Sequence, residues 1–204
     1  MHKHLVPLAA FASLIAVACS TKGDRQDAAG AGDTTTAPAA TATAPDSAAT
    51  APAAPALNDP TIVAIWDATN TADIETGQLA VQRGSSKAVR DFGAMLVRDH
   101  KAVRQQGRDL AKRLGVTPTP PADDASAKAH AEAMATLRAA QGKEFDRAFL
   151  DHEVQFHQQV IDAVNSTLLP AIQNADVKAL VVKVAPAFEA HRIAADNLRQ
   201  KLGA

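Results

Sequence analysis

The sequence predicts an all-α protein in which four long helices and one short helix form a bundle. Apolar residues recur every three or four positions from Asp59 to Ala204, and the alternation typical of strands is absent. Aromatic residues, which sheet proteins use heavily, are scarce, since the chain has one Trp, six Phe and no Tyr. Capping signals divide the region into helices of definite length.

The first two long helices are expected at residues 59–83 and 87–114. Asp59 and Pro60 form the start signal of the first helix, because proline fits the first turn of a helix. Gly84 and the two serines after it end that helix and cap the next. The turn between the helices is so short that they must run antiparallel.

Three more helices follow a proline-rich connector. A short alanine-rich helix is expected at 125–140, a long helix from Gly142 to about 167, and a last helix at 176–202. The two final helices are antiparallel across the turn LLPAIQN, while the connector and the short helix together can cross the length of the bundle. This is the connectivity of a ferritin-like four-helix bundle with a short crossover helix.

Residues 1–18 have the features of a lipoprotein-type signal peptide. A basic segment at 2–4 precedes an apolar run at 5–18 that is too short to span a membrane. Small residues lead into Cys19, the only cysteine, and the pattern resembles a bacterial lipobox. We therefore expect an exported protein whose partner is the membrane, reached through a lipid on Cys19. Because Ser20 rather than Asp follows, the outer membrane, facing the periplasm, is favoured if the cell is Gram-negative; an ordinary signal peptide is the alternative.

Residues 19–58 are predicted to be a disordered tether. Ala, Thr and Pro occupy 25 of the 39 positions from Ser20 to Asn58, so this stretch cannot form a core. A flexible chain of this length spans roughly 35 Å on average. The predicted organisation is thus a signal peptide at 1–18, a tether at 19–58 and a helical bundle at 59–204.

Composition excludes several classes of function. Lys and Arg number 21 against 22 Asp and Glu, so the net charge of −1 provides no cationic field for nucleic acid. A single cysteine excludes an internal disulfide, a CxxC redox pair, an iron–sulfur cluster and a c-type haem. The sequence also lacks a nucleophile elbow, a phosphate loop and a dinucleotide fingerprint.

Each long helix interrupts its apolar stripe with an ionisable residue near its middle. Asp73, His100 and His191 lie within the stripes of the first, second and last helices, whereas the wide apolar arc of residues 142–167 carries His152 on one side and His157 on the other. At 1.5 Å per residue, these positions differ in height by only about 6 Å. We predict one interior cluster of Asp73, His100, His191 and either His152 or His157.

Buried carboxylates and imidazoles must be paired or bind something. One interpretation is a hydrogen-bonded Asp–His network that fixes helix register. Another is a single transition-metal ion, Zn, Cu or Fe, held by two or three imidazoles and a carboxylate, with binding that weakens below about pH 6. Haem or a small ligand between the helices is a third. A ferritin-type dinuclear iron site is disfavoured, because no Glu is followed three residues later by His.

Four segments taken together resemble the family of domain of unknown function 4142, secreted bacterial proteins often labelled as membrane or outer-membrane proteins. The segments are NTADIETGQLA, RDFGAMLVRDH, GKEFDRAFLDHEVQFH and APAFEAH. The resemblance covers about residues 59–202. It implies a ferritin-like helical fold and no established activity.

The resemblance also implies positions for the family's polar residues. They fall on Asp73, Asp99 and His100, Phe145 and Asp146, His157 and His191. The chain departs from the family by having Phe156 before His157, where Asp-His is common, and an Asp-His pair at residues 151–152. The choice between His152 and His157 therefore stays open.

These observations favour a non-enzymatic envelope lipoprotein whose bundle binds a metal ion, in metal handling or stress tolerance. A metal-dependent oxidoreductase is the second hypothesis. A structural or partner-binding envelope module without a ligand is the third. The candidate metal ligands are Asp73, His100, His152, His157 and His191.

Overall fold

The computed structural model describes residues 57–122 and 125–203, which contain helices, turns and connections but no strand. The predicted signal peptide, Cys19 and nearly all of the predicted tether lie outside the described residues. Within the described part of the chain, no helix has both the length and the apolarity needed to cross a membrane.

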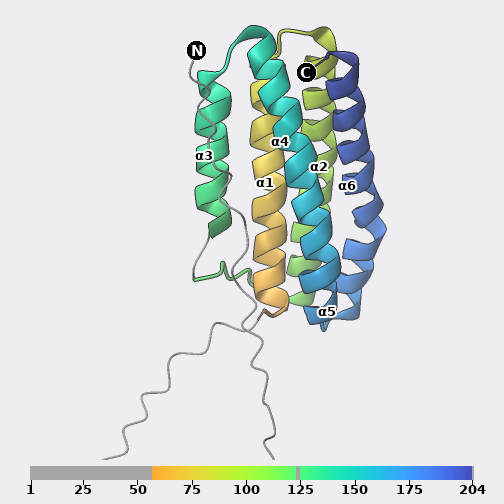
Figure 1. Ribbon diagram of the computed structural model, residues 1–204. Helices are drawn as coiled ribbons and strands as arrows, with labels where there is room; N and C mark the ends of the chain where they lie inside the picture. Colours follow the sequence, from red (N-terminus) through yellow and green to blue (C-terminus); the bar gives the residue numbers. More distant parts are fainter. Residues whose placement is uncertain (1–56, 123–124, 204) are drawn as a thin grey trace, which may run out of the picture. The chain divides into compact units, whose positions relative to one another are not determined.

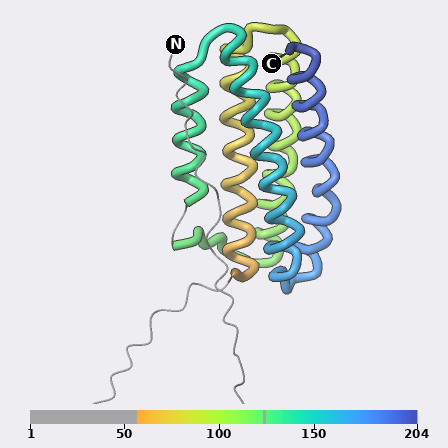
Figure 2. The backbone as a smooth tube through the Cα atoms, viewed as in Figure 1, coloured from red at the N-terminus to blue at the C-terminus, as the bar shows by residue number. Residues whose placement is uncertain are grey.

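Four long helices form a bundle, as the sequence predicts (Figure 1). Their bounds are Asp59–Arg83 for α1, Lys87–Leu114 for α2, Gly142–Ala163 for α4 and Ala175–Lys201 for α6. Helix α1 packs mainly on α2, and α4 packs mainly on α6, while contacts between α2 and α6 and between α1 and α4 close the bundle. The path of the backbone is clearest in Figure 2.

The short helix α3 (Ala125–Ala139) is the crossover element. It runs beside the bundle, along α1 and α4, and returns the chain to the end at which α4 begins (Figure 1). The buried residues of α3 are Met134 and Leu137. The long connection between the second and third bundle helices is therefore the ferritin-like one.

The helix starts follow from side-chain caps. Asn58, rather than Asp59, caps α1, since its side chain accepts a hydrogen bond from the backbone N–H of Thr61 at 3.0 Å. Asp59 instead accepts hydrogen bonds from the backbone N–H groups of Gln173 and Asn174, before α6. This links the start of the first helix to the start of the last.

The third bundle helix ends earlier than the predicted residue 167. After α4 the chain continues as a π-helical turn, η1 (Val164–Leu168), and a three-residue helix, α5 (Leu169–Ala171). Pro170 lies in α5 and has no N–H to donate into a regular α-helix, which is consistent with the altered turn before it.

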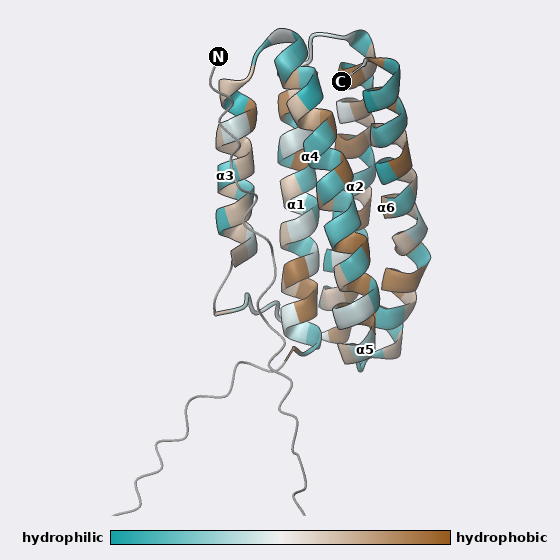
Figure 3. Cartoon of the chain, viewed as in Figure 1, coloured by the Kyte–Doolittle hydropathy of each residue, from teal (hydrophilic) through white to brown (hydrophobic). Residues whose placement is uncertain are grey.

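The interior consists of two apolar clusters with a polar layer between them. One cluster contains Phe92, Phe145 and Phe149, and the other contains Trp66 and Phe188. Figure 3 shows hydrophobic and hydrophilic residues interleaved along each helix, as expected for helices that bury one face. The polar residues of the middle layer are those that interrupt the apolar stripes.

Helices α1 and α2 approach closely through glycine. A Cβ atom placed on Gly93 would lie 2.7 Å from the backbone oxygen of Gly77 and 2.8 Å from the Cβ of Ala80. Real Cβ atoms do not tolerate such contacts, so these glycines allow the two backbones to lie side by side. The close approach also sets the distance between Asp73 and His100 across the same interface.

Candidate metal centre

The polar layer brings together residues from all four long helices. Its buried members are Asn70 and Asp73 from α1, His100 from α2, Glu153 and His157 from α4, and His191 from α6. None of them is more than 6% exposed. Of the residues proposed from sequence, Asp73, His100, His157 and His191 lie here, and His152 does not.

His100 is held by the amide of Asn70. The Nδ2 atom of Asn70 donates to the backbone oxygen of Trp66 at 2.8 Å, so its Oδ1 faces Nδ1 of His100 at 2.9 Å. An amide oxygen can only accept, so Nδ1 of His100 carries the proton and Nε2 is left with a lone pair. Burial, together with neighbouring His157, lowers the pKa of His100 to about 3, so the ring is neutral at pH 7.

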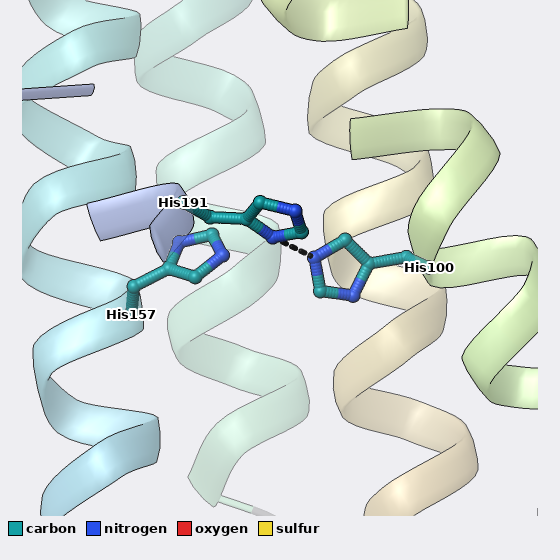
Figure 4. A group of neighbouring side chains, drawn as sticks. All are labelled: His100, His157 and His191. Carbon is teal, nitrogen blue, oxygen red and sulfur yellow. Dashed lines mark hydrogen bonds between the residues drawn. The ribbon is translucent and has the colours of Figure 1, made fainter. Parts of the chain in front are cut away.

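His191 is held in the same way by Asp99. Its Nε2 lies 3.2 Å from Oδ2 of Asp99, and because a carboxylate accepts, Nε2 is the protonated nitrogen. Nδ1 of His191 then has the lone pair, and it lies 3.2 Å from Nε2 of His100 (Figure 4). Burial also lowers the pKa of His191. Two nitrogens with lone pairs thus face each other at contact distance.

His157 completes a triangle of imidazoles. Its Nδ1 donates to the backbone oxygen of Glu153 at 3.0 Å, while Nε2 has no hydrogen-bond partner among the described residues. Its ring centroid lies 5.6 Å from that of His100 and 5.4 Å from that of His191. Figure 4 shows the three rings turned toward one another from different helices.

Two buried carboxylates lie beside this triangle. Asp73 has Oδ2 at 3.4 Å from Nδ1 of His100 and Oδ1 at 3.9 Å from Nε2 of His157. Glu153 has Oε2 at 3.4 Å from Nδ1 of His157. None of the four carboxylate oxygens has a well-formed hydrogen bond to any residue that the structure describes. Buried polar atoms without partners are rare in proteins.

The pKa values reflect this crowding of charge. Burial raises the pKa of Asp73 well above its usual range, and the nearby Glu153 raises it further. For Glu153, the effect of burial is outweighed by hydrogen bonding and charge from His157, so the pKa is lowered. For His157, burial alone would lower the pKa, but Asp73 and Glu153 raise it to about 9. Without a bound ion, His157 is therefore the cation of the centre.

The donors match those of a transition-metal site. The ligand atoms of His100, His157 and His191 lie within 4.8 Å of one another, and so do those of Asp73, Glu153 and His157. Imidazole with carboxylate suits Zn, Cu and Fe. The outer nitrogen of each imidazole is bound to an amide, a carboxylate or a carbonyl oxygen, which is the usual support for metal-binding histidines. A network of hydrogen bonds alone would leave the inner atoms unsatisfied.

His152 lies outside both groups of ligands. Its ring stacks on Phe156, with the ring centroids 5.6 Å apart. His130 lies elsewhere too: its Nε2 pairs with Glu75 at 2.8 Å, between α3 and α1. Sequence reasoning did not select Glu153 or Asn70 as site residues. The signal for Glu153 was its position four residues before His157, on the same helix face.

Comparison with a protein-family model identifies the relationship of the chain. The model described as Domain of unknown function (DUF4142) matches residues 43–198. No curated protein sequence matches the chain significantly.

Solved structures share the fold at low sequence identity. A Cu(II)-bound form of CopM is 16% identical with a TM-score of 0.56, covering 71% of this chain and 98% of that one. A DUF305 fragment from Deinococcus radiodurans is 16% identical with a TM-score of 0.61, covering 71% and 94%. A Cu(I)-bound form of CopM is 15% identical with a TM-score of 0.56, covering 70% and 96%. These likenesses establish the ferritin-like helical fold.

Proposed function

We propose a function for this chain, which belongs to the DUF4142 family: it binds one transition-metal ion in the bundle interior and serves in metal handling. His100, His157 and His191 would supply three nitrogen ligands. Asp73, whose Oδ1 lies 3.9 Å from Nε2 of His157, would supply the fourth. The observation that carries the proposal is that an oxygen acceptor occupies the outer nitrogen of each imidazole, which leaves Nε2 of His100, Nδ1 of His191 and, once it loses its proton, Nε2 of His157 as inner ligands.

The charge at the centre supports the same proposal. Of the six buried side-chain atoms without a hydrogen-bond partner among the described residues, five lie at the centre: both oxygens of Asp73, both oxygens of Glu153, and Nε2 of His157. A cation between them would satisfy atoms that protein donors do not reach. Copper-bound structures of CopM, which has the same fold, add support by analogy.

The burial of the proposed ligands supports metal binding rather than metal-dependent catalysis. Four protein ligands complete a tetrahedral site, whereas catalytic sites keep a position open for water or substrate. The proposed ligands are at most 6% exposed, so a substrate has little access to a bound ion. We further propose that the protein acts in the cell envelope, anchored through Cys19, on the strength of the lipobox-like pattern before that residue.

The test is metal binding by the full chain, purified without a polyhistidine tag. Wild-type protein should retain about one ion per chain after dialysis, measured by elemental analysis, and His100→Ala or His191→Ala should lose it. His152→Ala is the matched control, because this histidine lies outside both ligand groups. The control also accounts for His2 and His4, whose imidazoles stay in every variant. Equal retention by all variants would contradict the proposal.

A further inference from the structure

We infer that the centre discriminates by ionic charge, taking a divalent cation in preference to a monovalent or trivalent one, and that Glu153 is the residue that determines this preference. The inference rests on the proposed metal site. It concerns Glu153, which is not needed to complete a four-coordinate site made by three imidazoles and Asp73.

Glu153 is a fully buried carboxylate whose nearest charged neighbour is His157, at 3.4 Å. Its side chain is 0% exposed, and both of its carboxylate oxygens lack a hydrogen-bond partner among the described residues. Its ligand atom lies within 4.8 Å of those of Asp73 and His157. A carboxylate that only fixed the helices would be expected to accept hydrogen bonds. The carboxylate of Glu153 instead lies 3.4 Å from Nδ1 of His157 and in one group with Asp73, where its negative charge acts on any ion bound to these residues.

The charges facing the centre can be counted helix by helix. Helix α1 contributes Asp73, α2 contributes His100, α4 contributes Glu153 and His157, and α6 contributes His191. Asp99 of α2 lies at the edge, where Arg98 pairs with it at 2.7 Å. When the three imidazoles act as neutral ligands and the bound ion keeps both carboxylates ionised, these residues together carry a charge of −2.

A divalent ion makes this interior neutral. A monovalent ion such as Cu(I) or Ag(I) would leave one negative charge buried without a partner, and a trivalent ion would leave one positive charge. An uncompensated charge in a protein interior is strongly unfavourable. Three imidazoles alone bind soft and borderline ions of either charge. The carboxylates, and Glu153 in particular, therefore supply the discrimination.

The experiment compares two redox-inert probes, Zn(II) and Ag(I), on the full chain carrying Cys19→Ser, so that no thiol competes for silver. Competition titrations give the affinity for each ion. Glu153→Gln should weaken Zn(II) binding about 10- to 100-fold and leave Ag(I) binding unchanged or stronger. Glu153→Asp keeps the charge and should keep the wild-type ratio of affinities. Glu75→Gln is the control, because Glu75 lies outside the centre and pairs with His130.

The outcomes separate this inference from the metal site itself. If Glu153→Gln weakens both ions equally, or neither, charge selection is wrong while the metal site stands. If the wild-type chain binds neither ion, the proposed function fails. Should Glu153→Gln not give the helical circular dichroism of the wild type, Asp73→Asn makes the same comparison, since it also removes one charge. An unchanged Zn(II)-to-Ag(I) ratio in that variant would overturn the inference.

Discussion

His157 is the residue at which the two ligand groups meet. It belongs both to the imidazole triangle and to the group with Asp73 and Glu153. Its Nδ1 is occupied by the backbone oxygen of Glu153, so only Nε2 is available as a ligand. In the ion-free protein the two carboxylates hold a proton on this ring, with the pKa at about 9. Metal and proton therefore compete for one nitrogen.

Ion binding at neutral pH should release at least one proton from His157. Because the pKa of His157 is about 9, affinity should increase with pH through the range up to pH 9, at roughly tenfold per unit. If His157 had the usual imidazole pKa near 6.5, metal affinity would stop increasing well below pH 9. Calorimetric titration at pH 7.5 in buffers of different ionisation enthalpy measures the proton release. A value of zero would contradict this account.

The combined contribution of His100 and His157 to the stability of the ion-free protein should be greatest near pH 6.5. Folding lowers the pKa of His100 from 6.5 to about 3. Between these pH values the unfolded chain binds a proton at His100 and the folded chain does not, so stability falls as the pH decreases from 6.5 to 3. The pKa of His157 is raised to about 9, so its contribution is full below pH 6.5 and is lost as the pH rises through 9. Each proton changes the free energy of unfolding by at most about 1.4 kcal/mol per pH unit.

Urea unfolding at several pH values between 4 and 9 gives this profile. His100→Gln should flatten the acid side, because the variant has no imidazole at that position to protonate on unfolding. If the free energy of unfolding of the variant decreased as steeply below pH 6.5 as that of the wild type, groups other than His100 would control the acid dependence.

The polar layer could be predicted from the sequence, but the roles of some of its residues could not. An ionisable residue in an apolar stripe is visible in the sequence, and this is how Asp73, His100 and His191 were selected. Helix α4 is apolar over so wide an arc that both His152 and His157 fit its buried side, and only the packing of α1 and α6 separates them. Asn70 was visible in a stripe, yet its role depends on a hydrogen bond to a residue 30 positions away.

At the scale of the elements, the interface of α1 and α2 sets the geometry of the centre. Gly77 and Gly93 let these backbones touch, and Asp73 and His100 lie on the same two helices. Helix bounds could be predicted from the sequence because caps and glycines are local signals. An example is α2, whose start was predicted from the serines before it and whose observed bounds are the predicted 87–114. The turn η1 was not predicted, because a π-helical turn has no comparable local signal.

Gly93→Ala should destabilise the fold, although alanine is the better helix former. The added Cβ would lie 2.7 Å from the backbone oxygen of Gly77, and backbone cannot move away without separating the helices. We expect a loss of about 1–3 kcal/mol in the free energy of unfolding, as for other overpacked interiors. Metal affinity should fall as well, because His100 moves relative to Asp73. Ala94→Ser, at the exposed neighbouring position, is the control, and equal stability of the two variants would contradict the packing argument.

At the scale of the whole molecule, the candidate metal centre depends on the assembly of the complete bundle. All four long helices contribute ligands, so the ion can be bound only when the bundle is assembled, and binding should stabilise the folded state. The connectivity was predictable because the connection at 115–141 is long enough to cross the length of the bundle. The predicted anchor and tether lie outside the described residues and stay predictions.

The anchor has a direct test. Replacing Cys19 by Ser should move the protein from the membrane fraction to the soluble fraction of the envelope, because the residue proposed to carry the lipid is removed. Fractionation followed by immunodetection measures this, with Ser20→Ala as the control. Unchanged association of Cys19→Ser with the membrane would refute lipid anchoring.

The central claim is that three imidazoles from three helices bind one ion. X-ray absorption spectroscopy of the zinc-loaded chain tests it most directly. The account predicts three imidazole nitrogens at about 2.0–2.1 Å with a carboxylate oxygen as the remaining ligand, and the loss of one imidazole in His100→Ala. A spectrum without histidine ligands, or one that is identical in wild type and His100→Ala, would contradict it.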